Sequence, residues 1–333
     1  MPHRPSEPLS RRLTLFSPLA LLAAPRLAAA QTGAGQAATW PDRAVRIIVP
    51  YTPGGAADIA ARLMGERLTP LWKQPVVVEN RAGGNGIVGT EVVAKSPPDG
   101  LNLACVSVVH AVNVALYNTP YDALDDFTVV TVIYSVPLVM VAAPDFPANT
   151  PAEAAALMKR EPARANFAGT GGTVHLAGAM FAARTKQDIE HVPYRGSTAA
   201  HPDLMAGRVS VMFDTLPAVL GHVQSGKLKA LAVTSPARLP TLPSVPTMIE
   251  SGFDGFEAST WGAILGPKGM PAPVVDKIAA DTRAVFADDA MHARLDALGA
   301  TAVCNPPTEA TAFVRSEISK WSAVAKQAGI ERQ

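Results

Sequence analysis

Apolar residues along the chain follow two spacings, that of buried strands and that of amphipathic helices. Runs rich in β-branched residues that end at proline or glycine predict strands, as in VRIIVP at 45–50. Apolar residues three and four positions apart predict helices, as over 57–71, where Ile59, Leu63 and Leu68 share one face. The alternation of the two predicts an α/β fold with parallel strands covered by helices on both faces.

The same patterns give the expected order of elements. Strands are predicted at 45–50, 75–80, 101–107, 128–133, 138–142, 166–168, 189–193, 209–213, 229–233 and 259–265. Helices are predicted at 57–71, 87–94, 151–160, 173–184, 199–205, 216–225, 273–286, 289–298 and 308–328. The 30 prolines and 25 glycines are spread along the chain, which is typical of many short elements separated by turns.

The first thirty residues have the pattern of a secretory leader. A basic stretch precedes a weakly apolar run from Leu13 to Ala24, and Ala28-Ala29-Ala30 offers the small residues that a signal peptidase reads. The run is too short to span a bilayer as a helix. Because Arg11-Arg12 also resembles a twin-arginine signal, the export route stays open between the two kinds of leader. We expect 1–30 to be a cleaved signal peptide, and the protein to be periplasmic with no membrane span.

Composition and charge exclude several classes of protein. With 333 residues, 48% of them apolar and 17% charged, the chain is too apolar for disorder and long enough for a large core. A formal net charge of +1 argues against a nucleic-acid-binding protein. Two cysteines, Cys105 and Cys304, are too few for a disulfide framework or a four-cysteine zinc site, and their spacing does not say whether they pair.

Catalytic and metal-binding motifs are missing from the sequence. It contains no G-x-S-x-G elbow, no P-loop and no H-E-x-x-H, and its seven histidines lack the spacing of metal ligands. The segment Gly84-Asn85-Gly86-Ile87-Val88-Gly89 matches the dinucleotide fingerprint but does not begin at the end of the preceding strand, so we interpret it as structural. We therefore expect no cofactor, no metal and no catalytic residue.

Two glycine loops carry the functional signal instead. The first, Tyr51-Thr52-Pro53-Gly54-Gly55, leads from a strand into a helix, whose N-terminal amides and dipole can hold an anion without lysine or arginine. Asp58 falls in the first turn of that helix, where a carboxylate is favoured, and is expected among the ligand-binding residues. The second, Gly169-Thr170-Gly171-Gly172-Thr173, repeats this arrangement, with Thr173 as the expected N-cap. Each loop could be a tight turn without a ligand, but two of them favour two halves of one anion site, with His175 nearby in a packing role.

Several ordered blocks of sequence resemble the Bug family, the periplasmic solute-binding subunits of tripartite tricarboxylate transporters. The blocks are RIIVPYTPGGAADIAARL (46–63), VVVENRAGGNGIVGTEVVAKSPPDG (76–100), NTPYDALDDF (118–127), GTGGTVHLAGAMF (169–181), HVPYRGSTAAHPDLMAGRVSVMFDTLP (191–217) and GKLKALAVTSPARLPTLPSVPTMIESG (226–252). The resemblance spans about residue 41 to the C-terminus. Within it, His201-Pro202-Asp203 departs from the family pattern and puts the start of the helix at 199–205 in question.

The resemblance implies a type II periplasmic-binding-protein fold, in which two α/β lobes are joined by two crossing strands and a ligand cleft lies between them. It places the first lobe at 38–136 and 236–333 and the second at 137–235. It also implies that the first loop and Ser107 bind the ligand from one lobe, and the second loop and Asp214 from the other. The expected ligand is a small carboxylate, and the expected partners are membrane permease subunits, for a protein that is itself a monomer.

Two other functions remain open from the sequence. A periplasmic hydrolase or isomerase acting on a carboxylate would use Asp214 and His110, although Asp214 can equally cap the helix that starts near Leu216. A receptor that reports to a sensor protein would have the same binding loops and a different membrane partner. The sequence does not identify the carboxylate, because backbone amides bind any carboxylate.

Overall fold

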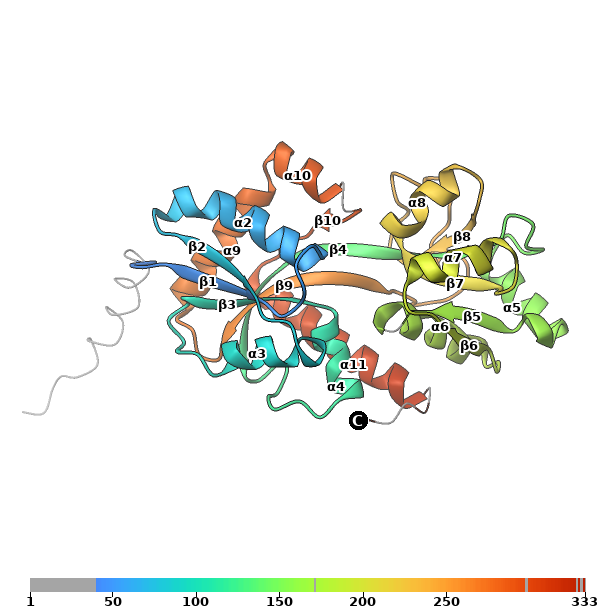
Figure 1. The fold of residues 1–333 in the computed structure, drawn as a ribbon, viewed down its shortest axis with the longest axis horizontal. Helices are drawn as coiled ribbons and strands as arrows, with labels where there is room; N and C mark the ends of the chain where they lie inside the picture. Colours follow the sequence, from blue (N-terminus) through green and yellow to red (C-terminus); the bar gives the residue numbers. More distant parts are fainter. Residues whose placement is uncertain (1–39, 171, 297–298, 328, 330–331, 333) are drawn as a thin grey trace, which may run out of the picture.

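The computed structural model describes residues 40–170, 172–296, 299–327, 329 and 332, and in it the chain forms two α/β lobes side by side (Figure 1). The predicted leader and Gly171 lie outside the described residues. No helix in the described part is long and apolar enough to cross a bilayer.

The first lobe is built around three parallel strands in the order β2-β1-β3, which continue into β9 and β4. Its strands are β1 (Val45–Val49), β2 (Val76–Asn80), β3 (Asn102–Ser107), β9 (Ser259–Pro267) and the short β10 (Thr301–Ala302). Its helices are α2 (Ala56–Trp72), α3 (Ile87–Ala94), α4 (Val109–Leu116), α9 (Ala272–Phe286), α10 (Asp289–Asp296) and α11 (Pro307–Gln327).

The second lobe repeats the motif with three parallel strands in the order β7-β5-β6. Its strands are β5 (Asn166–Gly169), β6 (Glu190–Pro193), β7 (Val211–Thr215) and β8 (Lys229–Val233). Its helices are α5 (Pro151–Arg160), α6 (Gly172–Thr185), α7 (Ser197–Met205) and α8 (Leu216–Gln224).

One long strand, β4 (Phe127–Ala142), connects the lobes, and β9 runs back beside it (Figure 1). β4 pairs antiparallel with β9 and β10 in its first part and with β7 and β8 in its second. The predicted parallel strands are present in each lobe, but the sheet as a whole is mixed. The crossing strands β4 and β9 run against their neighbours because each carries the chain from one lobe to the other.

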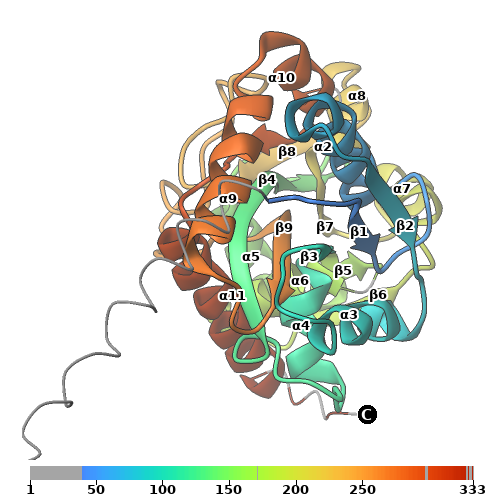
Figure 2. The ribbon, with the colours of Figure 1, turned by 90° about the vertical axis from the view of Figure 1, so that its left-hand side faces the viewer.

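Helices cover both faces of the first lobe, as the alternation predicted (Figure 2). α2 and α9 pack on one face around Leu63, Met64 and Ile278, all of them buried. On the other face α4 and α11 pack around Val112 and Val314. Both layers are close-packed apolar interiors, which fixes how the strand ends of this lobe are presented.

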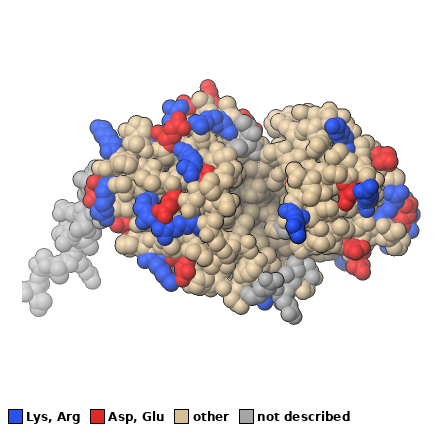
Figure 3. Space-filling view, in the orientation of Figure 1, with Lys and Arg blue, Asp and Glu red and all other residues tan. Residues whose placement is uncertain are grey.

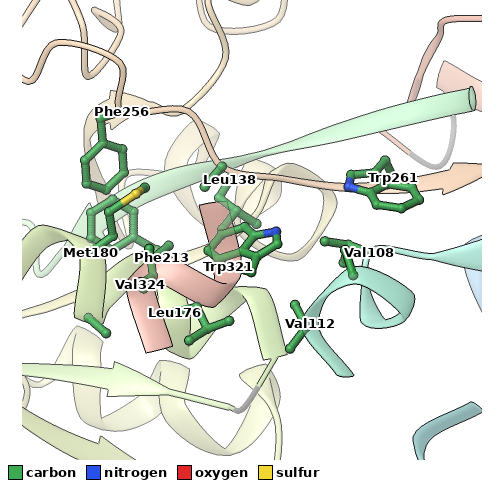
Figure 4. Packing of buried hydrophobic residues seen from close by; sticks show 14 of the residues in the cluster. Val108, Val112, Leu138, Leu176, Met180, Phe213, Phe256, Trp261, Trp321 and Val324 are labelled. Carbon is green, nitrogen blue, oxygen red and sulfur yellow. The ribbon is translucent and has the colours of Figure 1, made fainter. Parts of the chain in front are cut away.

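The core near the crossing strands mixes residues from both lobes with residues of α11 (Figure 4). Trp261 on β9 and Trp321 on α11 are both fully buried. The two indole N–H groups donate to the same carboxylate oxygen of Glu317, at 2.8 and 3.0 Å. Lys320 pairs with that carboxylate, so the buried charge is balanced beside the crossing.

Four elements differ from the sequence prediction, one of them the two-residue strand β10, which was not expected. α4 was not expected, because VVHAVNVAL has almost no polar face from which a helical period could be read. The separate strands predicted at 128–133 and 138–142 are one strand, since β4 continues through Pro137 opposite Ser259. α7 begins at Ser197 and runs through His201-Pro202-Asp203, so this departure from the family pattern lies inside the helix.

Candidate functional site

The predicted binding residues stand at the carboxyl ends of two pairs of parallel strands, one pair in each lobe. Tyr51 to Gly55 follow β1, Ser107 ends β3, Gly169 ends β5 and Asp214 lies near the end of β7. The first pair of strands belongs to one lobe and the second pair to the other. Figure 3 shows a hollow between the lobes whose walls carry few charged side chains. In α/β sheets this edge is where ligands bind.

The first glycine loop is exposed and ends in an uncapped helix. Thr52, Pro53, Gly54 and Gly55 are all exposed, and no side chain caps α2 at Gly55. Among the described residues, no acceptor pairs with the amides of Gly55 and Ala56. Free amides at the start of a 17-residue helix favour an anion there.

Asp58 holds this loop in place through hydrogen bonds to its carboxylate. It lies in the first turn of α2, as predicted, and is only 3% exposed. Its carboxylate accepts from Gly54 N–H at 3.0 Å, from the Asn80 amide at 2.8 Å and from Arg62. Burial would raise its pKa, but these hydrogen bonds and the Arg62 charge outweigh burial and lower it. Asp58 therefore positions the loop, and its oxygens are used within the protein.

Tyr51 joins the loop to the end of β3. Its phenol oxygen accepts a hydrogen bond from Ser107 N–H at 3.0 Å, which brings two of the predicted site residues together. Burial raises the pKa of the Tyr51 phenol to about 12. The phenol is therefore neutral at ordinary pH and adds no negative charge to the site.

The glycine segment 84–89 packs against Tyr51 and Pro50. Gly86 has a φ of +89°, and a Cβ there would lie 2.8 Å from the Tyr51 ring. A Cβ on Gly89 would lie 2.5 Å from the Arg81 carbonyl oxygen and 2.9 Å from the Pro50 backbone. These glycines therefore allow close packing below the first loop, in agreement with the structural interpretation of this motif.

The second glycine loop rests on two stacked histidines. The rings of His175 and His191 lie 3.9 Å apart, and a Cβ on Gly169 would lie 2.4 Å from Nε2 of His191. Burial first, and then the neighbouring His191, lower the pKa of His175 to about 4, so its ring is neutral at ordinary pH. His175 thus has the packing role that the sequence suggested.

The start of α6 differs from its prediction. The helix begins at Gly172, so Thr173 is inside its first turn, and the expectation that Thr173 would be the N-cap was wrong. Thr173 is buried, Thr170 is half-buried and Gly172 is exposed. The sequence favoured threonine as a cap, but the chain enters the helix through Gly172, whose φ of +53° glycine adopts without strain.

Asp214 is buried and held by His201. It is 1% exposed, and its Oδ2 lies 2.9 Å from Nε2 of His201, while its Oδ1 accepts from Thr215 N–H at 2.8 Å. Asp214 does not occupy the N-cap position of α8, which is Thr215, and no side chain makes a cap hydrogen bond there. The departure at His201 therefore supplies the partner of this strand-end carboxylate.

The two residues that the enzyme alternative requires, His110 and Asp214, each have another hydrogen-bond partner. Nε2 of His110 hydrogen-bonds to the Ala123 carbonyl at 2.8 Å, and burial lowers the pKa of this histidine to about 4. Asp214 has His201 as its partner, so the two residues that a hydrolase would combine are engaged elsewhere. Within the described residues, no group of three or more His, Cys, Asp or Glu side chains could hold a metal ion.

The two cysteines are separate buried thiols. Sγ of Cys105 donates to the Ala57 carbonyl at 3.4 Å and Sγ of Cys304 to the Ile133 carbonyl at 3.6 Å. Burial raises the pKa of both thiols to about 12. Neither thiol is therefore activated as a nucleophile.

The chain is similar in sequence to a family of transporter receptors. Residues 60–330 match the model of the family described as the tripartite tricarboxylate transporter family receptor. The chain is 37% identical over 296 residues to protein BugT of Bordetella pertussis, covering 87% of this chain and 91% of BugT.

Two solved structures are also similar to most of this chain. The structure of R. palustris Rpa4515 with adipate superposes with a TM-score of 0.71 at 34% identity, covering 88% of this chain and 100% of that one. MatC from Rhodopseudomonas palustris with bound malate gives a TM-score of 0.68 at 29% identity, covering 86% and 99%. The fold and its two lobes are therefore those of solute-binding proteins.

Proposed function

Because the chain belongs to the tripartite tricarboxylate transporter receptor family, we propose that it captures a small carboxylate between its lobes and delivers it to the membrane permease subunits of such a transporter. Members of this family are periplasmic receptors and not enzymes. The proposal extends to the binding residues, the delivery step, a monomeric state and export with the removal of 1–30.

One observation carries the binding proposal: the amides at the start of α2 have no acceptor among the described residues, and α2 begins just after the carboxyl end of β1. Each charge-assisted hydrogen bond to a carboxylate contributes roughly 1.5–3 kcal/mol. Three or four such bonds, after the cost of ordering the ligand, suffice for binding near −8 kcal/mol, or a Kd of about 1 μM. The adipate and malate in the two R. palustris proteins are ligands of this kind.

Isothermal titration calorimetry on EDTA-treated protein tests the proposal. The probes are adipate, malate and a panel of other small carboxylates, with 1,6-hexanediol as a control that has the length of adipate and no charge. We expect one carboxylate of the panel to bind one to one with micromolar or tighter affinity, and hexanediol to produce no heat of binding. If no carboxylate binds to the folded protein, the proposal is wrong.

A further inference from the structure

Arg195 is an unpaired positive charge next to the second glycine loop. It is exposed and lies in the turn that connects β6 to α7. Within the described residues, no carboxylate or carbonyl group pairs with its guanidinium group. The prediction of the site did not include it, although it stands in the block HVPYRGSTAA (191–200) on which the family resemblance partly rests.

The sheet register places Arg195 close to the loop. β5 and β6 are parallel neighbours in which Gly169 is opposite Pro193, and Tyr194 N–H donates to the Gly169 carbonyl at 2.9 Å. Neighbouring strands lie about 4.8 Å apart and consecutive Cα atoms about 3.8 Å. The Cα atoms of Arg195 and Gly169 are therefore within roughly 10 Å of each other.

The backbone of this turn is held on its other side as well. The Tyr194 hydroxyl donates to Oδ2 of Asp203 at 2.8 Å, and Oδ1 of Asp203 accepts from Arg208 at 2.7 Å. The nearby carboxylates thus have partners already, Asp203 in Arg208 and Asp214 in His201. The charge of Arg195 is left uncompensated at the edge of the sheet where the ligand is expected.

No other described basic side chain of this lobe has the same position. The other described lysines and arginines of this lobe without a partner each precede a strand, at the opposite edge of the sheet: Lys159, Arg160, Lys186 and Lys227. Arg195 alone among these unpaired groups follows a strand. Its placement is thus a feature of the edge at which the ligand is proposed to bind and not of the surface as a whole.

We infer that Arg195 binds a second carboxylate of the ligand, so that the protein selects dicarboxylates over monocarboxylates of the same length. The inference rests on the proposed function and adds the class of ligand to it. The loop amides bind the first carboxylate through hydrogen bonds. The planar guanidinium group binds the second through two parallel N–H donors, an arrangement that a lysine ammonium does not reproduce.

Calorimetry with matched ligand pairs tests this inference. The pairs are succinate with butyrate, glutarate with pentanoate, and adipate with hexanoate. For a dicarboxylate that binds to the wild-type protein, Arg195→Gln is expected to weaken its affinity at least tenfold and to change that of its monocarboxylate partner by less than twofold. Arg195→Lys is expected to fall between the two. The preference of the wild type for the dicarboxylate should decrease from 50 to 500 mM NaCl, and that of Arg195→Gln should not.

Lys227→Gln is the matched control, because it removes one exposed and unpaired charge at the far edge of the same lobe. It should leave both affinities within twofold of wild type. The inference is wrong if Arg195→Gln keeps the dicarboxylate affinity, if it weakens both members of a pair equally, or if only carboxylates outside these dicarboxylates bind to the wild type. Those outcomes leave the proposed function standing. If no carboxylate binds at all, the proposed function fails and this inference fails with it.

Discussion

Asp58 sets the conformation of the first glycine loop through contacts that no ligand needs to supply. Its carboxylate holds the Gly54 amide and the Asn80 side chain in place, while Arg62 balances its charge. The amides of Gly55 and Ala56 then point out of the loop without partners. A single buried carboxylate thus orders the loop in the protein without ligand, which lowers the cost of the binding proposed for this loop.

We predict that Asp58→Ala lowers the free energy of unfolding by about 2–4 kcal/mol and weakens carboxylate binding more than tenfold, because it leaves buried donors without an acceptor. Urea denaturation and calorimetry at pH 7 measure the two effects. Asp42→Asn is the control, since the Asp42 side chain is 66% exposed and its removal should change stability by less than about 0.5 kcal/mol. Wild-type stability in Asp58→Ala would contradict the positioning role.

The pH dependence of stability follows from the same residue. The pKa of Asp58 in the folded protein lies below the value of 3.8 for the free side chain. A lowered folded pKa means that its contribution is present above pH of about 4 and is lost as the pH falls through the folded pKa. The stability of Asp58→Asn, measured by urea denaturation between pH 5 and pH 2.5, should accordingly fall less steeply than that of wild type.

At the level of elements, α6 and β5 are packed so closely that the position of the second loop depends on one glycine. A Cβ on Gly178 of α6 would lie 2.2 Å from the ring of Phe167 on β5, and Phe167 is buried. Because β5 leads directly into the second loop, any shift of the helix against the strand displaces the residues at the strand end.

Gly178→Ala is expected to lower the free energy of unfolding by about 1–3 kcal/mol, because a methyl group there forces the helix and the strand apart. Gly221→Ala on α8 is the matched control, since a Cβ there meets no atom within 4 Å. In a helix this second change should stabilise the protein by up to about 1 kcal/mol. Equal stability of the two variants in urea would show that the contact with Phe167 is unimportant.

The residues at which each lobe begins and ends stay a prediction. The sequence placed the second crossing near residue 235. Phe256, however, stacks on Phe213 at 5.5 Å, and Phe253 lies 5.4 Å from Phe181, both in the second lobe. These contacts favour a crossing formed by β9 itself, about twenty residues later than the predicted bound.

At the scale of the whole molecule, the two loops stand on different lobes that β4 and β9 connect. A ligand that touches both loops stabilises the closed arrangement only by the difference between its affinities for the closed and open states. Moving a population from 1:99 to 99:1 takes about 5.5 kcal/mol of such difference. Contacts made only after closure, including the one proposed for Arg195, are of this kind.

We predict that a tightly bound carboxylate reduces the radius of gyration, because closure brings the lobes together. Small-angle X-ray scattering with and without the ligand measures it, and calorimetry confirms saturation independently. 1,6-Hexanediol at the same concentration is the control and should leave the radius unchanged. A saturated protein with an unchanged radius would mean that the cleft is rigid or already closed, and the role assigned to closure would be dropped.

The order of elements, both glycine loops and the family could be read from the sequence, because they rest on local patterns: hydrophobic period, glycine and proline punctuation, and ordered blocks. Asp58 in the first helical turn and the structural role of Gly84 to Gly89 followed in the same way. α4 and the continuous β4 did not, since neither has a local pattern that separates helix from strand or marks the crossing.

Contacts between distant residues were decided by the tertiary structure alone. The Tyr51–Ser107 hydrogen bond, the His201–Asp214 pair and the place of Arg195 beside Gly169 all depend on which strands are neighbours. Strand order follows from how the two crossings return the chain, and no local spacing encodes it. The sequence thus determined that two glycine loops lead from strands into helices, whereas the sheet order decided which side chains support them and which charge stands next to them.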